Sequence, residues 1–266
     1  MLNHFELTRI ARERIGRAVA HLSDETADTA TRVHEARKRF KEIRAILRLG
    51  RFGLDGDFAA LNVAFRDAAR ALAATREYDA LAGMAKTLRR AAHDPLERRA
   101  LTRVARVLGA VPAPPIDIQS PSLPSITFAA PGADWIARGL RKTYRDGRRA
   151  FREARAQRTA TAIHEWRKRV KDLWYEMQIV APSSARVAVL HELSRLLGDH
   201  HDVVELAAHV AANRRLFGKV TVQRIAVIAA RRLAEIEHAA FDKGGFLYAA
   251  PARAWVDDDM IRAAWA

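Results

Sequence analysis

The stretch Val33–Leu49, VHEARKRFKEIRAILRL, contains a pattern that returns at Ile163–Ile179 as IHEWRKRVKDLWYEMQI. Both copies follow the order apolar-His-Glu-x-Arg-Lys-Arg-apolar-Lys-acid-apolar, and their histidines, His34 and His164, lie 130 residues apart. Neither copy contains Gly or Pro, the residues that most disfavour a helix interior, so each copy is predicted to be one helix. The repeat also predicts that the chain consists of two related halves.

Each predicted helix places its positive residues on the face that carries the histidine. At about 100° per residue, this face holds His34, Arg37, Lys38, Lys41 and Arg48 in the first copy and His164, Arg167, Lys168 and Lys171 in the second. The opposite faces are apolar, with Ala36, Phe40, Ile43 and Leu47 in the first copy and Trp166, Val170, Leu173 and Met177 in the second. These apolar stripes are predicted to be buried.

The positive faces have two interpretations, an ordinary solvated surface or a surface that binds anions. Like charges three or four residues apart destabilise an isolated helix by about 0.2–0.5 kcal/mol per pair. Because the same unfavourable arrangement occurs twice, each time with a His at the same place, the pattern favours anion binding. His34 and His164 can donate to phosphate oxygens when protonated near an anion. The alternative is that each His holds its own helix bundle together by a hydrogen bond.

Both copies resemble the CHAD domain family, a family of helical domains named for its histidine. The matching residues are His34, Arg37, Lys38 and Lys41, then His164, Arg167, Lys168 and Lys171. The segment Leu196–Leu206, LLGDHHDVVEL, is similar to the family's Leu-Gly-x-x-x-Asp element and supplies Asp202. Arg70–Leu81, RALAATREYDAL, resembles its counterpart and supplies Asp79, with Thr75 where a Gly is usual. The resemblance covers nearly the whole chain.

The resemblance implies an all-α fold with two pseudo-symmetric four-helix bundles and a basic central groove between them. It also implies binding of inorganic polyphosphate, with no catalysis and no cofactor. Asp79 and Asp202 are then expected to orient arginines or lysines in the groove, or else to cap a helix or form a plain salt bridge. The expected organisation is an N-terminal half over 1–109, a linker over 110–133 and a C-terminal half over 134–266.

The amino-acid composition limits which partners and which cellular compartment are expected for this chain. The 266 residues include 46 Lys and Arg against 31 Asp and Glu, which gives a formal charge of +15. Such an excess favours polyphosphate, nucleic acid or an anionic membrane as a partner. The chain contains no Cys, so disulfides, thiolate nucleophiles and Cys-ligated metals are excluded, and a cytoplasmic location is expected. No apolar run approaches the ~18 residues that a membrane span needs.

The pattern of apolar residues predicts four helices, a linker, four helices and a tail. The predicted helices cover about 3–22, the first motif up to Gly50, 58–92 with an interruption near Thr75–Tyr78, 95–109, 135–156, 160–181, 184–217 and 220–241. Six of the nine prolines lie in the linker, between Pro112 and Pro131, where apolar side chains indicate packing on the surface. Gly244-Gly245 is predicted to end the last helix, and Trp255 and Trp265 to dock a tail that contains a short helix after Asp259.

The predicted helix over 135–156 has a basic stripe of its own. Arg138, Arg141, Arg145, Arg148 and Arg152 follow an i, i+3, i+7, i+10, i+14 spacing, which aligns them on one face. We expect Arg141, Arg145 and Arg148 to contribute to polyphosphate binding. The alternative is again a solvated surface.

Nucleic-acid binding and metal-dependent phosphate hydrolysis are the two alternative functions. A nucleic-acid-binding protein is allowed by the charge, and nonspecific binding at low salt is expected. However, aromatic residues make up only 7% of the chain, and no RNA-binding or zinc-finger motif is present. A metal-dependent phosphohydrolase is suggested only by His200-His201-Asp202 and by Glu235-x-x-His238, each without its partner motif. No catalytic or metal-binding residue is therefore predicted, whereas a location on polyphosphate granules and the oligomeric state stay open.

Overall fold

The computed structural model describes residues 3–72, 77–112, 122–129 and 134–256. In this part of the chain the regular structure is helical, and the only β feature is one isolated bridge between Leu54 and Phe128. The all-α prediction is confirmed. The helices are α1 (His4–Ser23), α2 (Thr29–Leu49), α3 (Phe58–Ala71), α4 (Glu77–Ala91), α5 (Pro95–Gly109), α6 (Trp135–Gln157), α7 (Ala160–Val180), α8 (Ala185–Ala212), α9 (Arg214–Phe217), α10 (Lys219–Leu247) and α11 (Ala252–Trp255).

Local sequence signals explain where many of these helices begin. A side-chain oxygen accepts a hydrogen bond from a first-turn N–H at Asn3, Asp28, Asp57, Asp94, Thr159 and Ser184. Such caps satisfy N–H groups that have no partner inside the helix, and each contributes about 1 kcal/mol. Pro95 follows its Asp cap at the first helical position, where a missing N–H costs no hydrogen bond.

The two motif helices, α2 and α7, form the centre of the molecule. α2 contacts α1, α3, α6 and α7, so it joins the N-terminal helices to the C-terminal ones. All residues of the two predicted apolar stripes are buried: Ala36, Phe40, Ile43 and Leu47 on α2, and Trp166, Val170, Leu173 and Met177 on α7. This burial fixes which face of each motif helix is left for the solvent.

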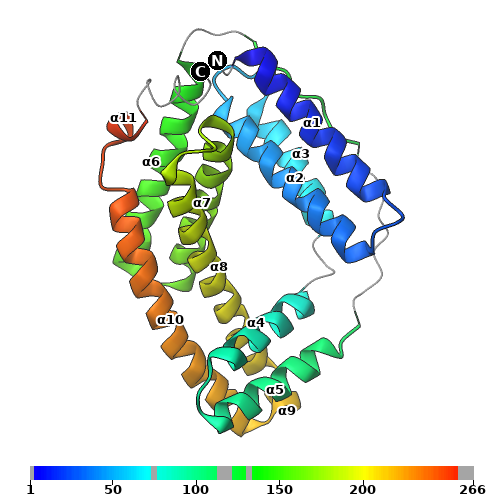
Figure 1. Ribbon diagram of the computed structural model, residues 1–266, viewed down its shortest axis with the longest axis vertical. Helices are drawn as coiled ribbons and strands as arrows, with labels where there is room; N and C mark the ends of the chain where they lie inside the picture. The colour runs from blue at the N-terminus through cyan, green and yellow to red at the C-terminus, as the bar shows by residue number, and fades with distance from the viewer. Residues whose placement is uncertain (1–2, 73–76, 113–121, 130–133, 257–266) are drawn as a thin grey trace.

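The molecule is elongated, and the long α8 and α10 run along one side of it from one end to the other (Figure 1). α1, α2 and α3 pack together, and α2 packs on α6 and α7. α4 and α5 lie at the other end, where α4 contacts α8 and α5 contacts α10. In chain order, α1 packs on α2 as α6 packs on α7, and α4 packs on α5 as α8 packs on α10. In such a comparison α3 and α4 together would correspond to the long α8. The pseudo-twofold relation of the halves stays a prediction.

Several boundaries differ from the sequence-based expectation. The predicted break at Gly244-Gly245 is wrong, because α10 continues to Leu247. Gly244 lies where a Cβ atom would overlap the rings of Phe151 and Trp166, so this glycine permits close packing inside a helix. The helix predicted to reach Phe217 ends at Ala212 and is followed by the separate short α9.

The linker and the tail pack on the body where the structure describes them. Ile126 and Phe128 are buried, and the Phe128 N–H donates to Thr8 Oγ1 at 3.2 Å. Trp255 is also buried and stacks on Tyr144 with 4.5 Å between ring centroids, which confirms its predicted docking. The predicted tail helix after Asp259, Trp265, Thr75 and most of the linker lie outside the described residues. Among the described helices, none is both long and apolar enough to cross a membrane.

Candidate functional site

Equivalent lysines of the two motif copies meet where α2 packs on α7. Lys41 and Lys171 occupy the same position of the repeat. Desolvation by the surrounding protein, with the charges of Arg37 and Arg167, lowers the pKa of Lys41 to about 8. Desolvation, with Arg167 and Lys41, likewise lowers the pKa of Lys171 to about 8, although Asp202 opposes the shift. Four cations from both halves thus lie within electrostatic range of one another, and we call them the central cations.

The central cations are accessible to a ligand although protein crowds around them. Lys41 is exposed, whereas Lys171, Arg37 and Arg167 are half-buried. Arg167 lies against Gly198 of α8, and its Nε is buried without a hydrogen-bond partner in the described part of the chain.

Within the described residues, Lys41, Lys171 and Arg167 form no ion pair with a carboxylate. The acid that acts on Arg167 and Lys171 is Asp202 on α8, whose pKa burial raises while these two cations lower it. A group of cations with one acid beside it has a strong local excess of positive charge. Such a surface favours a polyanion over a single carboxylate or phosphate.

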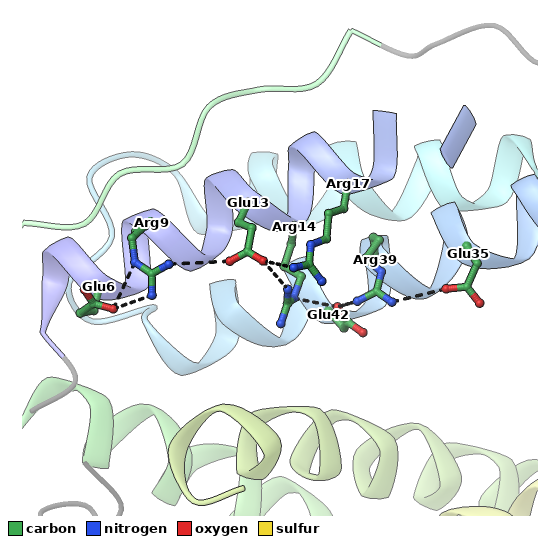
Figure 2. A network of polar contacts seen from close by, with 8 residues as sticks. All are labelled: Glu6, Arg9, Glu13, Arg14, Arg17, Glu35, Arg39 and Glu42. Carbon is green, nitrogen blue, oxygen red and sulfur yellow. Dashed lines mark hydrogen bonds and ion pairs between the residues drawn. The ribbon is translucent and has the colours of Figure 1, made fainter. Parts of the chain in front are cut away.

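The acidic residues Glu35 and Glu42 of α2 form ion pairs on another flank of the helix. Figure 2 shows a ladder of ion pairs between α1 and α2 that comprises Glu6, Arg9, Glu13, Arg14, Arg17, Glu35, Arg39 and Glu42. Glu42 alone accepts from Arg39 at 2.6 Å and from Arg14 at 3.0 Å. These acids balance the arginines that hold α1 on α2. The motif therefore separates the arginines of this ladder on one flank from the central cations on the other.

A histidine pair adjoins the central cations. The rings of His164 on α7 and His201 on α8 lie 4.6 Å apart between centroids, and His164 Nδ1 is buried with no hydrogen-bond partner among the described residues. Burial lowers the pKa of both, helped by His201 at His164 and by Arg167 at His201. His200 is buried instead, with its Nε2 3.3 Å from Glu237 Oε1. His34 lies exposed on α2.

The remaining predicted site residues have different surroundings. Lys38 and Lys168 are exposed beside the central cations in the motif, and Lys168 pairs with Glu165 at 2.5 Å. Arg48 forms an ion pair with Asp172 of α7 at 3.2 Å. Asp79 is exposed on α4, and no contact between it and the central cations is observed in the described residues.

The basic stripe of α6 is not the continuous open surface that its spacing predicts. Arg141 Nε donates to the Val256 carbonyl at 3.2 Å, and Arg148 Nε donates to the Tyr248 carbonyl at 2.9 Å. Arg145 between them is exposed. Arg141 and Arg148 thus hold the C-terminal segment on α6 by donating to its backbone carbonyls. Sequence spacing places the arginines on one face but does not show what covers that face.

Sequence reasoning missed several residues near the site. His201 precedes Asp202 in the predicted acidic element, but its approach to His164 depends on how α7 packs on α8. Arg44, Arg51 and Arg169 were also not singled out, although Arg44 lies one helical turn from Lys41. No cluster of His, Asp and Glu in the described part of the chain is arranged to hold a metal ion.

The fold and the central cations define an all-helical domain with a duplicated basic motif at its centre. The CHAD domain model matches residues 9–211, and the chain belongs to the CHAD domain family. The solved structure of PptA from Streptomyces chartreusis is similar in fold, with a TM-score of 0.63 and 16% sequence identity over 94% of this chain and 100% of that one. No curated protein matches this chain significantly.

Proposed function

We propose that this protein binds inorganic polyphosphate across the surface that α2 and α7 form together. The observation that carries the proposal is the meeting of Lys41, Lys171 and Arg167 from both halves without a balancing ion pair in the described residues. Membership of the CHAD domain family supports the same ligand, because the motif residues that meet here are those of the family resemblance.

Polyphosphate suits this surface better than other polyanions do. It carries about one negative charge per internal phosphate and offers no base or sugar for recognition, so binding needs a row of Lys and Arg. The positive face of α2 extends from Arg37 to Arg48, which corresponds to roughly 16 Å along a helix. Nucleic-acid binding, the alternative on charge, usually adds aromatic rings that stack on bases. The rings near the central cations are the histidines His164 and His201 and Tyr175, which is buried and so does not offer its face to a base.

In this proposal the protein binds polyphosphate and does not hydrolyse it. The ligand is either a free chain or a chain at the surface of a polyphosphate granule. The direct test is a calorimetric titration with polyphosphates of defined length at physiological salt. We expect affinity to rise with chain length until one chain spans both motif helices. Failure of long chains to bind, or displacement of polyphosphate by single-stranded RNA of equal charge, would overturn the proposed ligand. Release of phosphate from polyphosphate after addition of a divalent metal would show turnover and would contradict this part of the proposal.

A further inference from the structure

A second group of arginines surrounds a small cavity beside the central cations. The cavity has a volume of about 240 Å³, and Arg44, Arg48, Arg51 and Arg169 line it together with Asn62. These side chains come from α2 and the turn after it, from α3 and from α7, so the cavity exists only in the folded chain. We propose that this arginine pocket binds one phosphate group with a free end, either in free pyrophosphate or at the terminus of a polyphosphate chain.

The arginines are held in place before any ligand enters. Arg44 Nε donates to Asn62 Oδ1 at 3.0 Å, and the Arg51 guanidinium lies over the Phe58 ring at 4.3 Å from its centroid. Both contacts leave terminal guanidinium nitrogens available as donors, because they use the Nε atom or the flat face. Preorganised donors bind a phosphate group with less loss of side-chain entropy than mobile ones do.

The acids in the pocket do not balance its positive charge. Asp172 is shared between Arg48 at 3.2 Å and Arg169 at 3.4 Å. Asp146 of α6 also lines the pocket, but it is paired with Lys142 at 2.9 Å, a lysine that does not line it. Arg44 and Arg51 have no ion pair among the described residues, so two guanidinium groups are left to a ligand.

The crowding of charge in the pocket is large enough to affect Arg44. Burial, with the charge of Arg48, lowers the pKa of Arg44 to about 10 although Asp172 opposes the shift. A bound anion would offset that repulsion, since an opposite charge favours the protonated form of a base. The size of the cavity limits the ligand, because it is smaller than the roughly 300–1,000 Å³ typical of sites for drug-sized molecules.

The pocket occurs in only one of the two motif copies. Arg37, Lys41, Arg44 and Arg48 follow an i, i+4, i+7, i+11 row on α2, so the central cations and the pocket lie along one line of the helix. The positions of α7 that correspond to Arg44 and Arg48 are Trp174 and Gln178. A chain on the central cations therefore meets a phosphate pocket toward one end of α2 only. Use of the pocket by a chain terminus rests on the proposed function, whereas its binding of pyrophosphate does not.

The first test uses pyrophosphate and three double variants of equal charge change, compared by titration calorimetry at constant ionic strength. Arg44→Gln with Arg51→Gln removes the pocket donors, Lys41→Gln with Lys171→Gln removes central cations, and Arg152→Gln with Arg155→Gln changes exposed arginines of α6. We expect the pocket variant to bind pyrophosphate roughly 10-fold or more weakly, because two charge-assisted donors are lost. The other two are expected to stay within about threefold of wild type.

An unchanged affinity in a pocket variant with wild-type helicity and melting temperature would overturn the proposal. An equal loss in the central variant would overturn it too, since the anion would then bind the central cations.

The second test compares long polyphosphate with free ends against chains of the same length whose terminal phosphates are capped. The pocket variant should weaken binding of the uncapped chain more, and equal weakening would exclude the chain terminus as a source. Wild-type protein that binds pyrophosphate but no long chain would contradict the proposed function and leave the pocket standing.

Discussion

The two lysines where α2 packs on α7 release their protons more readily than an ordinary lysine does. The pKa of Lys41 and of Lys171 is about 8, below the usual 10.5, because of desolvation and neighbouring cations. Both lysines are therefore mostly charged at neutral pH, but at a cost in free energy that a polyanion would offset. Between about pH 8 and 10.5 the unfolded chain binds more protons than the folded one, so their contribution to stability rises with pH in this window.

The same shift predicts that polyphosphate affinity depends on pH. As the pH rises from 7 to 9 at constant ionic strength, Lys41 and Lys171 lose their protons and binding should weaken. A variant with Lys41→Arg and Lys171→Arg keeps its charge over this range and should show a flatter profile. Calorimetric affinities of both proteins at several pH values would measure the difference. Identical pH profiles would show that these lysines do not contact the ligand.

At the scale of single helices, the motif pattern predicted α2 and α7 well. A period of 3.6 residues determines which residues share a face, so the buried stripe through Phe40 and Val170 followed directly from the sequence. What covers a face depends on residues far away in the chain. The helical period therefore could not predict that Arg141 and Arg148 contact carbonyls of the tail. Nor could it predict the arginine pocket around Arg44.

Two neighbouring glycines in α10 give a matched stability prediction. A Cβ at Gly244 would lie 2.6 Å from ring atoms of Phe151 and Trp166, whereas nothing lies within 4 Å of one at Gly245. Gly245→Ala should stabilise the protein by up to about 1 kcal/mol, because alanine favours the helix. Gly244→Ala should destabilise it, since overpacking typically costs about 1–3 kcal/mol. Denaturant unfolding of both variants would measure this, and equal effects would contradict the close packing of α10 on α6 and α7.

At the scale of the whole molecule, the proposal places one ligand on two halves of the chain. In this proposal six Lys and Arg of the two motif faces contact the polyphosphate: Arg37, Lys38, Lys41, Arg167, Lys168 and Lys171. The formal charge of +15 attracts polyanions over a longer range, but contact with these six side chains is what releases counterions.

Salt dependence measures how many of those contacts form. If all six cations neutralise phosphates, the plot of log K against log salt should have a slope of roughly −4, at about −0.7 per contact for a single-stranded polyanion. Titrations between low and physiological salt give this slope. A flat response would mean that polyphosphate does not bind through the motif cations.

The central claim is that both motif helices hold the same polyphosphate chain. The most direct measurement is the affinity for long polyphosphate of two charge reversals, Lys38→Glu with Lys41→Glu and Lys168→Glu with Lys171→Glu. Arg214→Glu with Arg215→Glu on the short α9 serves as the control of equal charge change. Each motif reversal should weaken binding by roughly 10-fold or more, about 1.4 kcal/mol, with helicity and melting temperature near wild type and the control much less affected. Full affinity after either motif reversal, or loss of binding only together with loss of the fold, would contradict the claim.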